Sequence, residues 1–176
     1  MKKNIAILVG IVVLLVVLFG GYKVIKRYSI KSEPISKNDI NMKVFTGSVS
    51  SEYEGSNTLS YSFSIPDYTI STSSPEGDLV KIGDATSTHT TVYFSYEGGR
   101  GLSPSEYISE IIAPHVSVID ETGTSTMGDY EWQLAETAGS NWYITTSKDG
   151  QWIVAVESRK IWSDESNKLV SSFKAE

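Results

Sequence analysis

Two pairs of acidic residues are the first candidates for chemistry in this sequence. Asp120 is followed directly by Glu121, and Asp129 lies two positions before Glu131. Two carboxyl groups that flank a glycosidic bond can serve as general acid and general base. Acidic residues are also frequent in exposed turns, where they have no catalytic part. The pairs therefore raise one functional alternative, a small hydrolase that uses carboxylates.

Other catalytic and metal-binding patterns are weak in the sequence. It holds two histidines, His89 and His115, and no cysteine, whereas structural zinc sites usually take four Cys or His ligands. Its serines do not form the Gly-x-Ser-x-Gly motif of many hydrolases. We therefore expect no catalytic residue, no metal and no cofactor. A weak calcium site formed by Asp120, Glu121 and Asp129 stays an alternative, because Ca²⁺ prefers oxygen ligands.

The N-terminus carries the most informative pattern. A short basic region, residues 1–4, precedes an apolar run at residues 5–19 that only Gly10 interrupts. Extended to residue 25, the run reaches the roughly 17–25 residues that cross a hydrocarbon core. The run ends without the small residues that mark a cleavage site. We predict a retained transmembrane signal anchor at residues 5–25, with the lipid bilayer as its partner, rather than a cleaved signal peptide.

Two criteria for the orientation of this anchor disagree. Lys2 and Lys3 precede the run and Lys23, Lys26 and Arg27 follow it, which slightly favours a cytoplasmic C-terminal part. A very short basic region before an apolar N-terminal segment is instead typical of an export signal. We predict a single-pass protein of the cell membrane with an extracytoplasmic C-terminal domain, and keep the opposite orientation as the alternative.

The remainder of the chain is acidic. All 21 acidic residues lie beyond residue 28, with only ten of the 15 basic residues, so this part has a formal net charge of about −11. Binding to a phosphate backbone needs clustered Lys and Arg, and we therefore expect no nucleic-acid partner. The abundant negative charge indicates a soluble surface.

Composition divides the remainder into a linker and a domain. Residues 26–58 are rich in Ser, Lys, Asn, Asp and Glu and have no sustained periodicity. They predict a polar linker that separates the domain from the bilayer, although residues 42–45 could form a short strand or adhere to the domain. Residues 59–176 are then one folded domain, long enough to bury a core.

The helix signals are local and strong. Ser103 is a capping residue, Pro104 suits the first helical position, and Glu106 completes a capping box. An apolar stripe from Tyr107 to Ile112 follows and predicts a helix with one buried face. A second predicted helix closes the chain, capped by Ser163 or Asp164, with Leu169, Val170 and Phe173 buried and Trp162 available as a hydrophobic staple.

Alternation of apolar and polar residues predicts three strands before the first helix, at residues 60–65, 79–82 and 90–96. A three-stranded meander lies between the two helices. The order of elements predicts an α+β fold, with an antiparallel sheet of about six strands and helices packed on it as an α/β/α sandwich.

Trp132, Trp142 and Trp152 recur at intervals of ten within the meander. They are either an exposed aromatic platform or core residues on adjacent strands. A three-residue loop at 148–150 would place Trp142 opposite Val156 and on the same face as Trp152, with Trp132 joining them if residues 139–141 make a similar loop. A two-residue turn at Asp149 and Gly150 would instead put Trp142 on the face opposite Trp152. The coherent apolar face favours the three-residue loop and the core interpretation. The remaining aromatic residues suggest a partner surface, formed by Tyr68, Tyr93, Tyr96 and Tyr143.

The segment 61–66, Tyr-Ser-Phe-Ser-Ile-Pro, the short helix after Pro104, the Trp-rich meander and the closing helix resemble a known sandwich domain. It is shared by PsbP-type photosystem II extrinsic proteins and the Mog-type Ran-binding family, and the resemblance covers roughly residues 59–174. It implies a binding or assembly module without catalysis, usually extracytoplasmic in bacteria. We therefore predict a membrane-tethered, non-enzymatic module at the outer face of the cytoplasmic membrane that binds a protein or envelope component. The alternative is a small cell-envelope hydrolase that uses carboxylates.

Overall fold

The computed structural model describes residues 41–51, 57–75, 77–98 and 101–176. The predicted basic region 1–4, the predicted anchor 5–25 and residues 26–40 of the predicted linker lie outside the described residues. Within the described part, no helix combines the length and apolarity needed to cross a membrane.

A small sheet opens and closes the described chain. Strand β1 (Met42–Ser51) pairs antiparallel with β2 (Asn57–Pro66), and β10 (Lys174–Ala175) pairs with the other edge of β2. The short strand that the sequence allowed at residues 42–45 is present and extends to Ser51, so the linker prediction is wrong for residues 46–51, 57 and 58. Phe45 stacks on Phe63 with ring centroids 5.2 Å apart, and Val49 is buried. The intervening Ser, Thr and Gly residues hide this alternation in the sequence.

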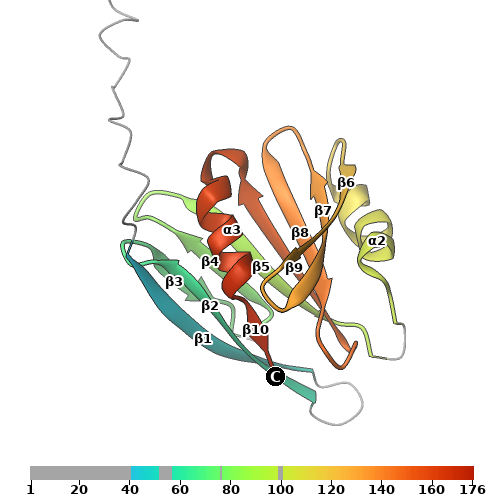
Figure 1. The fold of residues 1–176 in the computed structure, drawn as a ribbon, viewed down its shortest axis with the longest axis horizontal. Coiled ribbons are helices and arrows are strands. Elements are labelled where there is room, and N and C mark those ends of the chain that lie inside the picture. Colours follow the sequence, from blue (N-terminus) through green and yellow to red (C-terminus); the bar gives the residue numbers. More distant parts are fainter. Residues whose placement is uncertain (1–40, 52–56, 76, 99–100) are drawn as a thin grey trace, which may run out of the picture. The chain divides into compact units, whose positions relative to one another are not determined.

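A larger antiparallel sheet has seven strands in the order β3-β4-β5-β9-β8-β7-β6 (Figure 1). Its strands are β3 (Ile70–Ser73), β4 (Leu79–Gly83), β5 (Thr88–Tyr96), β6 (Asp120–Met127), β7 (Tyr130–Glu136), β8 (Ser140–Thr146) and β9 (Trp152–Arg159). The α+β class is confirmed. The expected single sheet of about six strands is corrected to two sheets, because β3, β6 and the two-residue β10 carry too few apolar residues to show as strands and β1 was allowed only at residues 42–45.

The first helix begins as predicted. The Ser103 hydroxyl accepts a hydrogen bond from the Glu106 backbone, and the Glu106 carboxylate accepts one from the Ser103 backbone at 2.8 Å. Helix α2 (Pro104–Tyr107) continues as the π-helical turn η1 (Ile108–Ile112) and the 3₁₀ turn η2 (Ala113–His115). Tyr107, Ile108 and Ile112 are buried, whereas Ile111 is exposed at the rim of a cavity described below.

The closing helix has a different start from the predicted one. A 3₁₀ turn, η3 (Lys160–Trp162), precedes α3 (Ser163–Ser172), and Trp162 is the N-cap without a side-chain capping bond. Trp162 does not act as a staple within the helix but stacks on His89, with ring centroids 4.0 Å apart. Leu169, Val170 and Phe173 are buried as predicted.

Two apolar clusters lie on the two faces of the large sheet. The first fills the space between the two sheets and α3 and includes Phe63, Trp132 and Val154. The second lies beneath α2 and η1 and includes Trp142 and Ala155. Strand β9 contributes to both clusters, which confirms that it is covered on both faces.

All three meander tryptophans are buried, but they do not share a face. Trp142 pairs with Glu157 instead of Val156, because the β8–β9 loop has one residue more than predicted. Ser147 closes that loop by donating its backbone N–H to Trp152 O at 2.8 Å. On the other side of β8, Thr137 N donates to Ser140 O at 2.9 Å, so the β7–β8 turn is shorter than predicted. A shift of one residue moves a side chain to the opposite face, and Trp142 lies under α2 for this reason.

Candidate functional site

An apolar cavity of about 220 Å³ lies between η1, η2 and the large sheet. The capping box starts α2 at a fixed point, and the apolar side of the turns that follow faces β5, β8 and β9. The walls are formed mainly by aromatic and branched side chains. The lining residues are Tyr93, Tyr107, Ile111, Ile112, His115, Val116, Trp142 and Ala155.

Both tyrosines of the cavity have a carboxylate nearby, and Tyr93 forms a hydrogen bond to the one near it. Tyr93 Oη donates to Glu157 Oε2 at 3.1 Å. Burial, followed by the charge and hydrogen bond of Glu157, raises the pKa of Tyr93 to about 12. Burial and the nearby charge of Glu97 also raise the pKa of Tyr107. Both hydroxyls therefore stay protonated near neutral pH, and the rings give the cavity an uncharged wall.

Trp142 forms another part of this wall. Its ring is nearly parallel to that of Tyr93, with centroids 6.0 Å apart and an interplanar angle of 15°. Only 7 % of the residue is exposed, and its indole Nε1–H finds no acceptor among the described residues. Trp142 also borders a second hollow of about 500 Å³, which has polar residues such as Glu136, Asn141 and Asn167 in its walls. The cavity under η1 is the more apolar of the two.

The four tyrosines of the predicted partner surface do not lie together on an exposed face. Tyr143 is buried and donates to Asn167 Oδ1 at 3.0 Å. Tyr96 is half-buried, receives a hydrogen bond from Asn57 and packs edge-on against Trp152. Tyr93 lines the cavity. Only Tyr68 is exposed, and the surface prediction is corrected for Tyr143, because it occupies the core side of β8.

The carboxylates singled out in the sequence, Asp120, Glu121, Asp129 and Glu131, are all exposed. Glu121 Oε2 accepts hydrogen bonds from Ser105 Oγ and Gln133 Nε2, both at 3.0 Å. No three Asp, Glu or His side chains in the described ranges come close enough to hold a metal ion. These four acids therefore do not form the enclosed pair that the hydrolase alternative requires.

A second cluster, around His89, lies at another place on the large sheet. His89 Nε2 is 2.9 Å from Asp84 Oδ2, and Nδ1 is 3.5 Å from Ser87 Oγ. Hydrogen bonds from the Thr86 side chain and backbone, and then from His89, lower the pKa of Asp84. The residue types of a serine-hydrolase triad meet here, but the Ser–His separation exceeds the 2.6–3.2 Å typical of an activated nucleophile. The contacts fix the imidazole beneath Trp162.

Tyr68 and Trp162 lie beside this cluster, and two exposed isoleucines, Ile70 and Ile161, are close to them in the chain. We call these four residues the entry-end patch. Tyr68 and Trp162 are neighbours, with ring centroids 6.3 Å apart, and Ile161 is 82 % exposed. The described chain begins beside this patch, since Asp67 N donates to Asn41 O at 2.9 Å. Lys43 Nζ also donates to the carbonyl oxygens of Asp67 and Thr69, at 3.1 and 2.6 Å.

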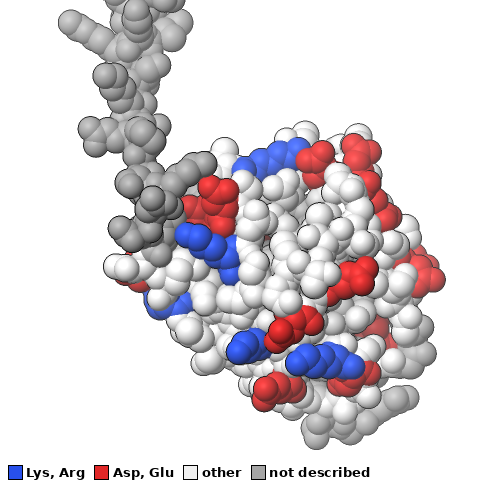
Figure 2. All heavy atoms as spheres, in the orientation of Figure 1, with Lys and Arg blue, Asp and Glu red and all other residues white. Residues whose placement is uncertain are grey.

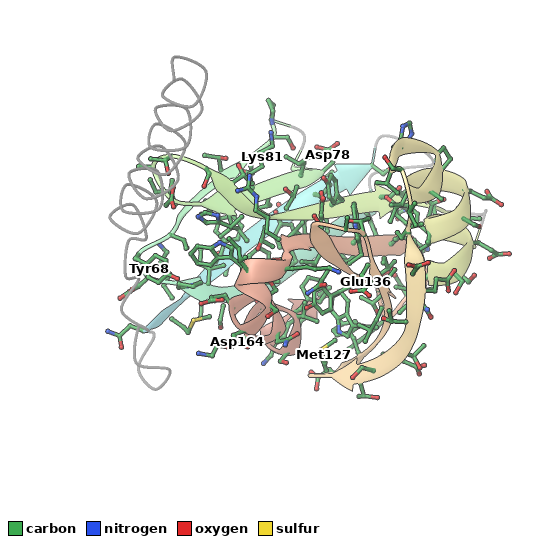
Figure 3. All side chains as sticks on the ribbon, turned by 90° about the horizontal axis from the view of Figure 1, so that it is seen from above. Tyr68, Asp78, Lys81, Met127, Glu136 and Asp164 are labelled. Carbon is green, nitrogen blue, oxygen red and sulfur yellow. The ribbon has the colours of Figure 1, made fainter. Side chains whose placement is uncertain are left out.

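The patch and the cavity lie at opposite ends of the domain. Figure 3 shows Tyr68 at one end, pointing outward, and the α2 region at the other. Figure 2 shows basic side chains on one face of the domain as separate groups next to acidic ones. Sequence reasoning named one residue of each site as part of a partner surface, Tyr68 of the patch and Tyr93 of the cavity, but neither site as a whole. The stripe from Tyr107 to Ile112 marked the buried side of the helix, but it could not indicate a cavity between helix and sheet.

Comparisons with known proteins give little further information. No family model matches the chain, and no curated protein matches it. One similar solved structure is a protein from Bacteroides thetaiotaomicron VPI-5482, determined at 1.50 Å resolution. Its TM-score is 0.45 at 10 % identity, over 66 % of this chain and 45 % of the other. The chain thus spans less than half the length of that protein.

Proposed function

We propose that the protein is a single-pass, membrane-tethered binding module without enzymatic activity, at the outer face of the cytoplasmic membrane. Residues 5–25 anchor it in the bilayer, and the domain binds a protein or envelope component. The observation that carries the binding part is the apolar cavity beneath η1, which lies at the end of the domain opposite to Asn41, where the described chain begins. The α/β/α arrangement and the resemblance to PsbP-type and Mog-type domains belong to the same proposal.

The volume of the cavity indicates what it accommodates. At about 220 Å³ it is smaller than the roughly 300–1,000 Å³ of most small-molecule sites. It is large enough for one apolar side chain, and deeply inserted aromatic or aliphatic side chains are the usual energetic centres of protein interfaces. Tyr93, Tyr107 and Trp142 supply apolar walls that would exclude water from such a side chain. The partner therefore contributes a single apolar anchor residue.

Tethering makes a modest affinity sufficient. An anchored domain meets membrane partners at a high effective concentration, so a small contact area suffices for occupancy. Whatever its conformation, the segment 26–40 can span at most about 50 Å. The domain therefore begins no farther than about that distance from the end of the anchor.

Site-specific photocrosslinking of the full-length chain in its native membrane tests this function. A photoreactive residue at Ile111, on the rim of the cavity, should give one adduct of defined mass. The same residue at Lys81, exposed on β4, should give none and serves as the control. Equal adducts at both positions, or none at Ile111, would contradict the binding role.

The side of the membrane needs a separate experiment. Protease added to intact cells, after removal of any outer barrier, should degrade the domain if it is extracytoplasmic. A domain that is degraded only after lysis would overturn the outer-face assignment and leave the crosslinking result unaffected.

A further inference from the structure

We propose that the entry-end patch inserts into the interfacial layer of the bilayer, so that the domain lies on the membrane surface through Tyr68, Ile70, Ile161 and Trp162. This inference rests on the membrane anchor of the proposed function and deepens it. It assigns an orientation to the domain.

The exposure of the patch is the first argument. Ile161 is 82 % exposed, Ile70 55 % and Tyr68 49 %, and the described residues contain only six exposed large hydrophobic residues. Tyr68 is also a neighbour of Trp162, which is half-buried. Large apolar side chains gathered at one place on a soluble surface mark a contact site. Tyrosine and tryptophan are the residues that favour the membrane interface, because they combine an apolar ring with a polar group.

The position of the patch identifies its occupant. The described chain starts at Asn41, whose carbonyl accepts a hydrogen bond from Asp67, the residue before Tyr68. Lys43 ties the start of β1 to the same turn through the carbonyls of Asp67 and Thr69. Fifteen residues, 26–40, separate the predicted anchor from Asn41, and they can reach about 50 Å at most. The bilayer is therefore the apolar phase nearest to this end of the domain.

The patch is held in a fixed shape. Trp162 is stacked on His89 at 4.0 Å, and His89 is bound to Asp84 at 2.9 Å. The η3 turn that presents Ile161 is also anchored at Lys160, whose backbone N–H donates to Gly139 O at 3.1 Å. Insertion therefore requires little ordering of side chains, which favours binding.

The charges around the patch predict which lipids matter. Lys160 forms an ion pair with Glu136 at 2.8 Å, and Lys43 binds backbone carbonyls. The charges of Glu165 and Asp67 act on Tyr68, where they add to burial in raising its pKa. Arg159 lines the same hollow as His89 and Glu157, and Asp84 is bound to His89, so the described residues around the patch offer no excess of positive charge to anionic headgroups. Contact with the bilayer is apolar, so it takes place on neutral lipid and withstands salt.

A single-cysteine experiment tests the inference, because the chain has no native cysteine. Full-length Ile161→Cys, labelled with a polarity-sensitive fluorophore, is reconstituted into phosphatidylcholine vesicles. We expect a blue shift of the emission and quenching by lipids with a nitroxide in the acyl chain. Val118→Cys is the matched control, since Val118 is 65 % exposed and lies just beyond η2, near the cavity. Its label should show neither effect.

Flotation of the same vesicles separates the two proposals. If the chain floats with the vesicles but the label at position 161 stays in water, the patch does not bind the bilayer and the anchor stands. Equal quenching at positions 161 and 118 would also overturn the inference, because the domain would have no preferred orientation. A chain that does not float would refute the anchor itself. Loss of the blue shift in high salt would refute the apolar nature of the contact.

Discussion

The indole N–H groups of Trp132 and Trp142 have opposite surroundings, and this difference predicts opposite responses to the same substitution. Trp132 Nε1 donates to Met127 O at 3.2 Å. Trp142 Nε1 has no acceptor among the described residues. Both side chains are at least 93 % buried, because their exposed fractions are 0 % and 7 %. Changing each to Phe removes the same atoms, so effects on the unfolded chain largely cancel in the comparison.

The expected magnitudes follow from the surface and hydrogen bonds removed. Either change takes away roughly 50 Å² of buried apolar surface, which costs about 1 kcal/mol. Trp132→Phe also loses one hydrogen bond, worth about 1 kcal/mol, so its unfolding free energy should fall by about 2 kcal/mol. Trp142→Phe removes a buried donor that costs the native protein about 1–3 kcal/mol. Its unfolding free energy should therefore stay the same or rise, about 2 kcal/mol or more above that of Trp132→Phe.

Urea unfolding of the full-length chain in detergent, followed by far-ultraviolet circular dichroism, measures both values without relying on tryptophan fluorescence. Equal slopes of free energy against urea would show that the comparison is between similar unfolded states. If Trp142→Phe destabilises the protein as much as Trp132→Phe does, the Trp142 N–H has an acceptor and the description of the cavity wall is wrong.

Three further predictions concern a turn and two ionisable groups. Gly128 and Gly150 both have positive φ, +61° and +71°, but a Cβ at Gly128 would meet Ser171 O, whereas at Gly150 it would meet nothing within 4 Å. Gly150→Ala should lower the unfolding free energy by about 1 kcal/mol, and Gly128→Ala should lower it clearly more. Equal decreases in melting temperature would contradict the close approach of Gly128 to α3. The pKa of Asp84 is lowered in the folded protein from its ordinary value of 3.8. Its ionised carboxylate therefore stabilises the fold fully above pH 3.8, and this contribution is lost as the pH falls below that value. Asp84→Asn should therefore be destabilising at neutral pH and become neutral in strong acid, while Asp129→Asn, at an exposed position, should be neutral throughout. The pKa of Tyr93 is raised from 10.0 to about 12 in the folded protein. Protonated Tyr93 therefore stabilises the fold fully below pH 10.0, and this contribution is lost as the pH rises to about 12. Over this pH range the unfolding free energy of Tyr93→Phe should fall less than that of the native chain. Identical decreases would contradict the burial of the Tyr93 hydroxyl.

Local signals in the sequence predicted local structure well. Ser103 and Glu106 cap α2 in the structure as their spacing predicts, since a capping box needs only residues within one turn. Strands β2, β4 and β5 were found from alternation, because each has a buried face. The α+β class followed from these elements and their order.

Strands without apolar alternation were not found. Strand β6 has exposed residues at most positions, and β3 has four residues of which only Ile70 is large and apolar. Both lie at edges of the large sheet. Their positions depend on hydrogen bonds to neighbouring strands, which composition does not reveal. Strand β1 was anticipated only at residues 42–45, since most of the following positions are Ser, Thr and Gly and show no apolar alternation.

The cavity could not be predicted because it depends on the lengths of two turns. One additional residue in the β8–β9 loop, and a shorter β7–β8 turn, move Trp142 from the face shared by Trp132 and Trp152 to the face of α2. The residue types of the turn are compatible with both loop lengths, because Gly150 has a positive φ in the structure and would have one in the shorter loop as well. With Trp142 on the other face, the cavity would lose one of its aromatic walls. The site that supports the binding proposal therefore rests on strand register, because a shift of one residue between β8 and β9 would turn the Trp142 side chain away from α2.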